Sequence, residues 1–168
     1  MELPKRKNIR LKHYDYSSNG AYFLTICVKD GQNLFGEIAV GGTSPAIVFV
    51  KLNAIGDMIK TYIENINTIY NDITVQKYVV MPNHIHMLVT VDCEGGRTMF
   101  APTEARAPTM SRVVKQFKGA ITKQMGYSIW QRSYYDRVIR TEAEYQYAWQ
   151  YIDENPAKWE EDRHFVGT

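Results

Sequence analysis

Apolar residues recur along this 168-residue chain in two different spacings, which predict where it forms strands and where it forms helices. Short runs rich in aromatic and β-branched residues, bounded by turn residues, are typical of strands. Such runs span residues 21–28, 46–52, 73–80, 84–91 and 134–139. The run at 46–52, together with residues 34–40 and the Gly-rich segment between them, predicts a hairpin or an edge excursion.

Three other segments repeat apolar residues every three or four positions, the spacing of an amphipathic helix. They are residues 53–69, 110–125 and 141–155. The last begins with Thr141 and Glu144, a T-x-x-E capping box. It is expected to end near Asn155, because Pro156 disfavours helical geometry in the residue before it. Residues 92–109 show no period and are rich in Gly, Pro, Ala and Thr, so we expect a mobile loop there.

The predicted order of elements is strand, helix, strand, strand, helix, strand and a final helix. This order predicts an α+β fold of the ferredoxin-like, split β-α-β type. Such a fold has an antiparallel sheet with helices on one face, here with an appended C-terminal helix. The length suits one domain, and no repeat or linker divides the chain. We therefore expect residues 1–168 to form a single domain, with residues 1–20 as a basic N-terminal arm.

Composition is typical of a soluble globular protein, since 45% of the residues are hydrophobic and 23% are charged. No apolar run approaches the ~18 residues that a membrane span requires. The basic N-terminus is not followed by the apolar stretch of a signal peptide. We therefore expect a cytoplasmic protein with no membrane contact. Cys27 and Cys93 lack the spacing of a zinc or redox motif, so we interpret them as reduced, packed thiols.

Positive charge gathers in two segments, although the net charge of the whole chain is only +2. Residues 1–12 carry a net charge of +4, and residues 109–137 carry a net charge of +5. Two basic segments in a nearly neutral chain favour a positive face for a polyanion, although ordinary solvated surfaces fit the same counts. The candidate DNA-binding residues are Lys5, Arg6, Lys7, Arg10, Lys12, Arg112, Lys115, Lys118 and Arg132.

Two histidines stand one residue apart in the apolar run 79–89, where an unpartnered imidazole would be unfavourable. Residues i and i+2 of a strand point to the same face, so His84 and His86 should face together. At that spacing their ring nitrogens can converge on one divalent cation. Satisfied core or surface histidines, which are the more common source of this pattern, are the alternative. The longer motifs of other His-x-His hydrolases and phosphodiesterases are absent from the sequence.

The last predicted helix places Tyr147, Tyr151 and Asn155 at four-residue intervals, in one stripe. An adjacent apolar stripe would hold this helix to the sheet; it consists of Tyr145, Ala148, Trp149 and Ile152. If the first stripe faces the histidines, Asn155 could offer its amide oxygen to the cation. Tyr151 would then be a nucleophile beside a Lewis acid. Aromatic packing remains the alternative for Tyr151.

Three separated motifs resemble, in the right order, those of the REP-associated tyrosine transposases, a branch of the single-tyrosine HUH endonucleases. The motifs read YVVMPNHIHMLV, WQRSYYDRVIR and YIDENPAKW. The segment IRLKHYDYSSNGAYFLTICV is similar to the opening of the same family, so the resemblance covers nearly the whole chain. It implies a bacterial, nucleoid-associated enzyme that nicks and rejoins single-stranded DNA near palindromic hairpins. The implied cofactor is a divalent cation, Mg²⁺ or Mn²⁺.

The same resemblance implies roles for individual residues. His84 and His86 match the metal-binding pair of the family, and Tyr151 matches the nucleophile that forms a 5′-phosphotyrosine. Asn155 stands where related transposases place a glutamine ligand. The expected partner is single-stranded or hairpin DNA, and the chain could act as a monomer or a homodimer.

Two other functions remain open from the sequence. One is a protein that binds hairpins without cutting them, and the other is a metal-dependent phosphodiesterase that uses water. Trp130 and Tyr134 could stack on DNA bases or pack in the core, and Tyr135 should point away from Tyr134. His164 lies in an acidic, tail-like segment, and we expect no role for it.

Overall fold

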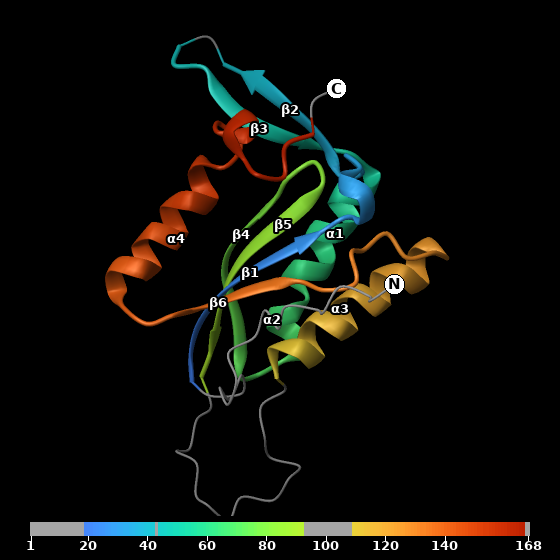
Figure 1. Cartoon of the computed structure of the whole chain (residues 1–168), viewed down its shortest axis with the longest axis vertical. Coiled ribbons are helices and arrows are strands. Elements are labelled where there is room, and N and C mark those ends of the chain that lie inside the picture. Colours follow the sequence, from blue (N-terminus) through green and yellow to red (C-terminus); the bar gives the residue numbers. More distant parts are fainter. Residues whose placement is uncertain (1–18, 43, 93–108, 167–168) are drawn as a thin grey trace, which may run out of the picture.

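The computed structural model describes residues 19–42, 44–92 and 109–166. Its main sheet is antiparallel, with the strand order β4-β5-β1-β6. These strands are β1 (Gly20–Cys27), β4 (Ile73–Val80), β5 (His84–Val91) and β6 (Tyr135–Ile139). The strands β2 (Gly36–Gly41) and β3 (Ile47–Leu52) form the separate hairpin that the sequence predicted (Figure 1).

The described α-helices are α1 (Ala54–Glu64), α2 (Ile66–Ile69), α3 (Met110–Met125) and α4 (Glu142–Glu154). The sequence predicted one helix over 53–69, whereas the structure divides it at Asn65. Asn67 accepts a hydrogen bond from the backbone N–H of Val75 at 2.7 Å, which ties α2 to β4. The bounds of α3 and α4 confirm the predictions for those helices.

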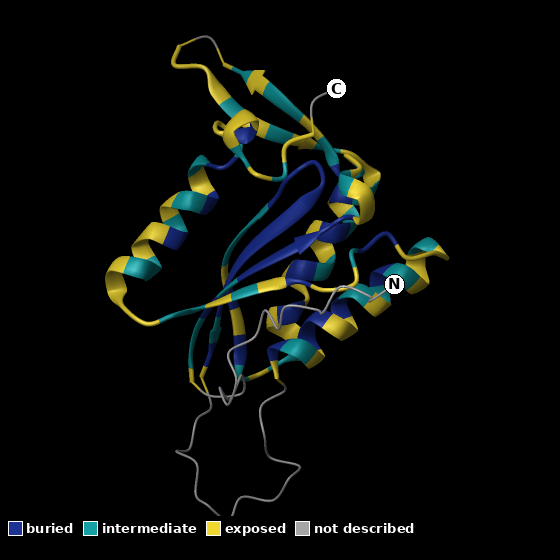
Figure 2. Cartoon of the chain, viewed as in Figure 1, coloured by how far each residue is buried: buried dark blue, intermediate teal, exposed yellow. Residues whose placement is uncertain are grey.

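The four-stranded sheet separates two apolar layers. Alternate residues of β1 and β5, such as Leu24, Ile26 and Met87, pack with α1, α2 and α3 in the main core. Leu88 faces the other way and packs against Ala148 and Ile152 of α4. Figure 1 shows α4 on the opposite side of the sheet from α1 and α3, and Figure 2 shows the buried strands between them. The ferredoxin-like prediction with an appended helix is therefore confirmed.

The turn between β4 and β5 fixes the position of His84, the first residue of β5. Backbone N–H groups of Val28 and Phe35 donate to the carbonyls of Asn83 and Pro82, both at 2.9 Å. These bonds anchor the turn to the residue after β1 and to the residue before β2. Because side chains alternate along β5, His84 then lies on the same face as Leu88, the face that α4 covers.

Several predictions concern residues outside the described part of the chain. These residues make up most of the arm 1–20 and most of the loop 92–109. The arm includes the candidate DNA-binding residues Lys5, Arg6, Lys7, Arg10 and Lys12. Their predicted mobility and DNA contacts stay predictions. Within the described residues, no helix combines the length and the apolar character that crossing a membrane demands.

Candidate functional site

β5 brings two imidazole nitrogens together, because the Nε2 atoms of His84 and His86 lie 3.0 Å apart. His84 Nδ1 lies 2.9 Å from Oδ1 of Asn83, whose Nδ2 donates to two carbonyls elsewhere. An amide oxygen only accepts, so Nδ1 of His84 carries the proton and Nε2 keeps a lone pair. His86 Nδ1 lies 2.9 Å from the hydroxyl of Thr25, which can hold the same tautomer. Metal-binding histidines use their second nitrogen in this way.

Burial keeps both histidines neutral. Loss of solvent, reinforced by the neighbouring His86, lowers the pKa of His84 to about 2. Burial likewise lowers the pKa of His86. Phe23 of β1 stacks on the His86 ring, with ring centroids 5.1 Å apart. The pair is therefore held in the neutral form in which imidazole binds metals.

α4 carries Tyr151 to the histidines, and the ring centroids of Tyr151 and His86 lie 5.2 Å apart. The Tyr151 hydroxyl donates to Oδ2 of Asp162 at 3.1 Å, and Nδ2 of Asn155 donates to the same oxygen at 3.2 Å. Burial and the charge of Asp162 raise the pKa of Tyr151 to about 12, so the phenol is protonated in this state. Two residues of the predicted stripe of α4, Tyr151 and Asn155, thus lie beside the histidines.

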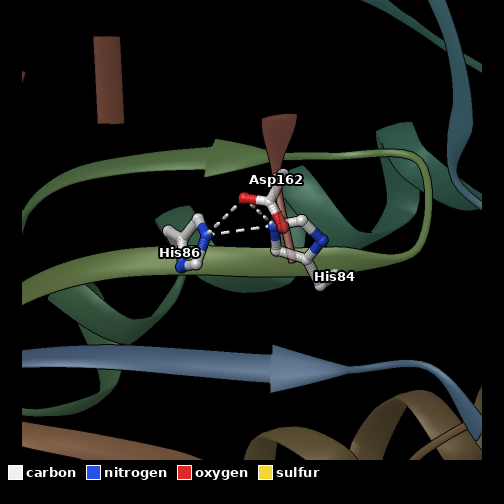
Figure 3. Close-up of side chains that lie close together, drawn as sticks. All are labelled: His84, His86 and Asp162. Carbon is white, nitrogen blue, oxygen red and sulfur yellow. Dashed lines mark hydrogen bonds and ion pairs between the residues drawn. The ribbon is translucent and has the colours of Figure 1, made fainter. Parts of the chain in front are cut away.

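Asp162 is a site residue that the sequence analysis missed. It follows the short 3₁₀ helix Trp159–Glu161, and its Oδ2 lies 4.0 Å from Nε2 of both histidines. Figure 3 shows its carboxylate facing the two rings. Burial disfavours the ionised form, but hydrogen bonds from the backbone N–H of His164 and from Asn155 hold the pKa of the carboxyl well below its usual range. No periodicity marks this segment, so no sequence signal of useful strength could have found Asp162.

His164 does not lie in a tail, which corrects the sequence prediction. Its ring centroid lies 4.7 Å from that of His84, and its Nδ1 lies 3.7 Å from Sγ of Cys27. Its carbonyl accepts a hydrogen bond from Asn83 at 2.8 Å, and its backbone N–H donates to Oδ1 of Asp162 at 2.7 Å. The segment after α4 therefore folds back over the histidine pair and positions the Asp162 carboxylate.

An open cavity of about 810 Å³ adjoins His86 and is bounded by β6 and α4. Its walls include Phe23, Tyr135, Tyr147, Tyr151 and Arg163. Tyr147 is 67% exposed and its ring stacks on Tyr151. The guanidinium of Arg163 lies 5.1 Å from the Tyr135 ring centroid. Exposed aromatic faces beside an arginine suit the stacking of nucleobases.

The aromatic candidates near β6 divide between the core and this cavity. Trp130 is buried against Phe35 and Phe117, and its Nε1 donates to the carbonyl of Lys118 at 3.2 Å. Tyr134 is also buried. Tyr135 is exposed at the cavity, so it is the one of this group that an unpaired base can reach.

The basic candidates on and after α3 differ in their surroundings. Nζ of Lys118 donates to the backbone carbonyls of Gln131 and Ser133, at 2.9 and 2.7 Å. Burial lowers the pKa of Lys118 to about 8. Lys118 therefore braces the segment before β6, a role that the sequence did not predict. The remaining candidates are exposed: Arg112, Lys115 and Arg132. Their contact with DNA stays a prediction.

The residues present fit a divalent cation. Among the described residues, His84, His86 and Asp162 form a His/Cys/Asp/Glu group whose donor atoms lie within 4.8 Å of one another. Two imidazoles with one carboxylate are a donor set that transition metals accept readily. Asn155 is also buried, and its Oδ1 has no hydrogen-bond partner among the described residues. A buried polar atom without a partner is uncommon in folded proteins, and it is the Nδ2 of the same amide that faces Asp162.

One family model and two known proteins match this chain. The family described as "Transposase IS200 like" matches residues 49–155. An uncharacterized protein of Haemophilus influenzae is 33% identical over 175 residues, which cover 96% of this chain and 93% of that protein. A solved REP-associated tyrosine transposase bound to a REP hairpin has 21% identity and a TM-score of 0.53. That match covers 95% of this chain and 74% of the other, and it shows a common fold.

Proposed function

Because this chain belongs to the IS200-like transposase family, we propose that it nicks and rejoins single-stranded DNA beside palindromic hairpins, using Tyr151 and a divalent cation. One observation carries the proposal: the Tyr151 hydroxyl from α4 and the two Nε2 atoms from β5 all lie within 4.0 Å of Oδ2 of Asp162. A phenol next to a cation site is what phosphotyrosine chemistry needs. The hairpin bound to the solved structural neighbour supports hairpin DNA as the partner.

In the proposed reaction the Tyr151 oxygen attacks phosphorus and the bond to the 3′ oxygen breaks. The 5′ phosphate stays on Tyr151, the phenol proton passes to solvent, and the leaving 3′ oxygen takes up a proton. Asp162 orients the phenol by accepting its hydrogen bond. A divalent cation, Mn²⁺ or Mg²⁺, would neutralise charge on the non-bridging phosphate oxygens. The phosphotyrosine keeps the energy of the diester, so a second 3′-hydroxyl can reverse the attack and join another strand without ATP.

The substrate strand is proposed to run through the cavity beside Tyr151. Exposed rings of Tyr135 and Tyr147 offer faces on which unpaired bases can stack. Stem phosphates would contact exposed cations, which requires no base recognition. The residues proposed for these contacts are Arg112, Lys115, Arg132 and the basic cluster of the N-terminal arm.

We also propose that the whole chain acts as one domain and completes its site without a second copy. The family match covers residues 49–155, so it leaves out β1 and Asp162. Yet β1 and Asp162 both lie next to the histidine pair. α4 packs on the sheet of its own chain through Ile152 and Leu88. This packing supports a monomer in which Tyr151 and the histidines belong to the same molecule.

A covalent-adduct assay tests the proposal. Purified protein is incubated with Mn²⁺ and a hairpin oligonucleotide that carries a labelled single-stranded flank, and adducts are separated under denaturing conditions. We expect an adduct with the wild type and none with Tyr151→Phe. Tyr147→Phe is the matched control, because Tyr147 lies one turn earlier on α4 and stacks on Tyr151. Adduct formation by Tyr151→Phe would contradict the assignment of the nucleophile.

The same assay separates the other two functions. A hairpin-binding protein would bind the oligonucleotide tightly without forming an adduct at any metal concentration. A phosphodiesterase that uses water would cut without an adduct, and cutting would survive Tyr151→Phe. His84→Ala is expected to abolish the adduct while largely sparing DNA binding, since phosphate contacts supply most of the affinity.

A further inference from the structure

The three donor atoms of the candidate metal group have a geometry that one ion can satisfy. Nε2 of His84, Nε2 of His86 and Oδ2 of Asp162 form a triangle with sides of 3.0, 4.0 and 4.0 Å. One point lies about 2.2 Å from all three atoms, close to the metal–nitrogen and metal–oxygen bond lengths found in proteins. Two imidazoles and one carboxylate around such a point favour Mn²⁺, Fe²⁺ or Zn²⁺ over Mg²⁺.

Each donor is also oriented by a second hydrogen bond, as ligands in metal sites usually are. Asn83 holds His84, and Thr25 holds His86, through their Nδ1 atoms. The other carboxylate oxygen of Asp162 accepts the backbone N–H of His164 at 2.7 Å. Three donors from two distant parts of the chain are thus fixed toward one point.

The charge around Asp162 favours a cation at that point. Its side chain is only 1% exposed, and a buried carboxylate is unfavourable unless it is paired or coordinates a metal. The two histidines beside it are also buried. The neighbouring Arg163 is exposed and directs its Nε to His164 at 3.0 Å.

Asn155 has a different relation to the same point. It donates through Nδ2 to Oδ2 of Asp162. An ionised carboxylate has no proton to give, so the amide must turn its N–H₂ toward Asp162 and its oxygen away from it. In this state Asn155 supports the carboxylate. Tyr151 donates to the same oxygen, which has two lone pairs, so cation binding requires one of these two hydrogen bonds to lengthen.

We propose that Asp162 is the third protein ligand of the divalent cation in the DNA-free protein, and that Asn155 positions Asp162 instead of binding the cation. The inference deepens the proposed function and rests on it, because the cation is the one that the nicking reaction would use. Asp162 lies beyond residue 155, where the family match ends. It is therefore a ligand assigned from this chain's own C-terminal segment.

Metal titration of the full-length, DNA-free protein tests the proposal. Mn²⁺ binding is measured by calorimetry and by loss of the free-ion electron paramagnetic resonance signal. Asp162→Asn should weaken binding by about 100-fold or more, whereas Asn155→Ala should weaken it by about 10-fold, as expected for a residue that only orients a ligand. Thermal unfolding without metal shows that each variant is folded. Wild-type affinity in Asp162→Asn, or no Mn²⁺ binding by the wild type, would overturn the inference.

A second readout distinguishes a ligand from its neighbour directly. In Asp162→Cys a bound Co²⁺ or Cd²⁺ should give a thiolate-to-metal charge-transfer band, which arises only when sulfur is coordinated. Asn155→Cys is the matched control and should lack this band, and the wild type gives the background of its native cysteines. A band in Asn155→Cys but not in Asp162→Cys would reverse the two roles. Metal binding with no Tyr151 adduct would leave this inference standing and remove only the proposed function.

Discussion

Lowering the pH from 7 to 5 in the presence of a chelator is expected to reduce the free energy of unfolding by at least about 2 kcal/mol. Burial lowers the pKa of both His84 and His86 in the folded chain. In the unfolded chain each has its ordinary pKa of about 6.5. Below that pH the unfolded chain binds more protons than the folded one, so stability falls as the pH falls.

The magnitude follows from linkage. A histidine whose folded pKa lies well below 5 loses about 2 kcal/mol between pH 7 and pH 5 when its unfolded pKa is about 6.5. His84 is such a histidine, and the lowered pKa of His86 adds to the loss in the same direction. Asp162 does not add to this window, because its pKa is held below the usual carboxyl range and its stabilising effect is lost only at lower pH.

Urea unfolding followed by circular dichroism at a series of pH values measures the effect. The control is the double variant His84→Gln with His86→Gln, which keeps the other titrating groups, including the half-buried His164. The variant should lose most of the pH dependence in this range. Equal slopes in the two proteins would refute the neutral, buried pair on which the metal site depends.

Substitutions elsewhere give further outcomes. Ile152→Ala should destabilise the protein by about 2–4 kcal/mol in urea unfolding and lower the adduct yield, because Ile152 packs α4 against Leu88; full stability would mean that α4 is held elsewhere. Lys118→Met should destabilise the fold by about 1–3 kcal/mol, whereas Lys115→Met should spare stability and reduce the salt slope of hairpin binding by about 1. An unchanged slope would place the stem away from α3. Tyr147→Ala should weaken binding of a single-stranded flank by about 1–3 kcal/mol in fluorescence anisotropy, and an unchanged affinity would move the strand out of the cavity.

The sheet and one half of the candidate site could be predicted from local patterns. Alternation along a strand places His84 and His86 on one face whatever the rest of the chain does. Four-residue spacing likewise places Tyr151 and Asn155 on one side of α4. Both patterns hold because their periods come from backbone geometry. The apolar residues Leu88 and Ile152 then decide which sides meet.

Predictions were less accurate for residues whose hydrogen-bond partners lie outside the local sequence pattern. Only one of the two hydrogen bonds of the predicted capping box at α4 forms: Thr141 accepts the N–H of Glu144 at 3.2 Å. The Glu144 carboxylate accepts instead from the backbone of Arg140 and the side chain of Arg137. The break between α1 and α2 depends on contacts with β4. Lys118 was expected among exposed cations, yet two carbonyls before β6 engage it.

The position of Asp162 could not be predicted from the local sequence pattern. Its segment has no repeating pattern, and its position is set by contacts with residues about eighty positions away in the chain. Trp159 stacks on His84 at a centroid distance of 5.8 Å, and Asn83 donates to the carbonyl of His164. Asn83 also fixes the tautomer of His84. One turn residue therefore aims a histidine lone pair and anchors the segment that carries the carboxylate, so the metal geometry and the closure of the C-terminal segment depend on the same side chain.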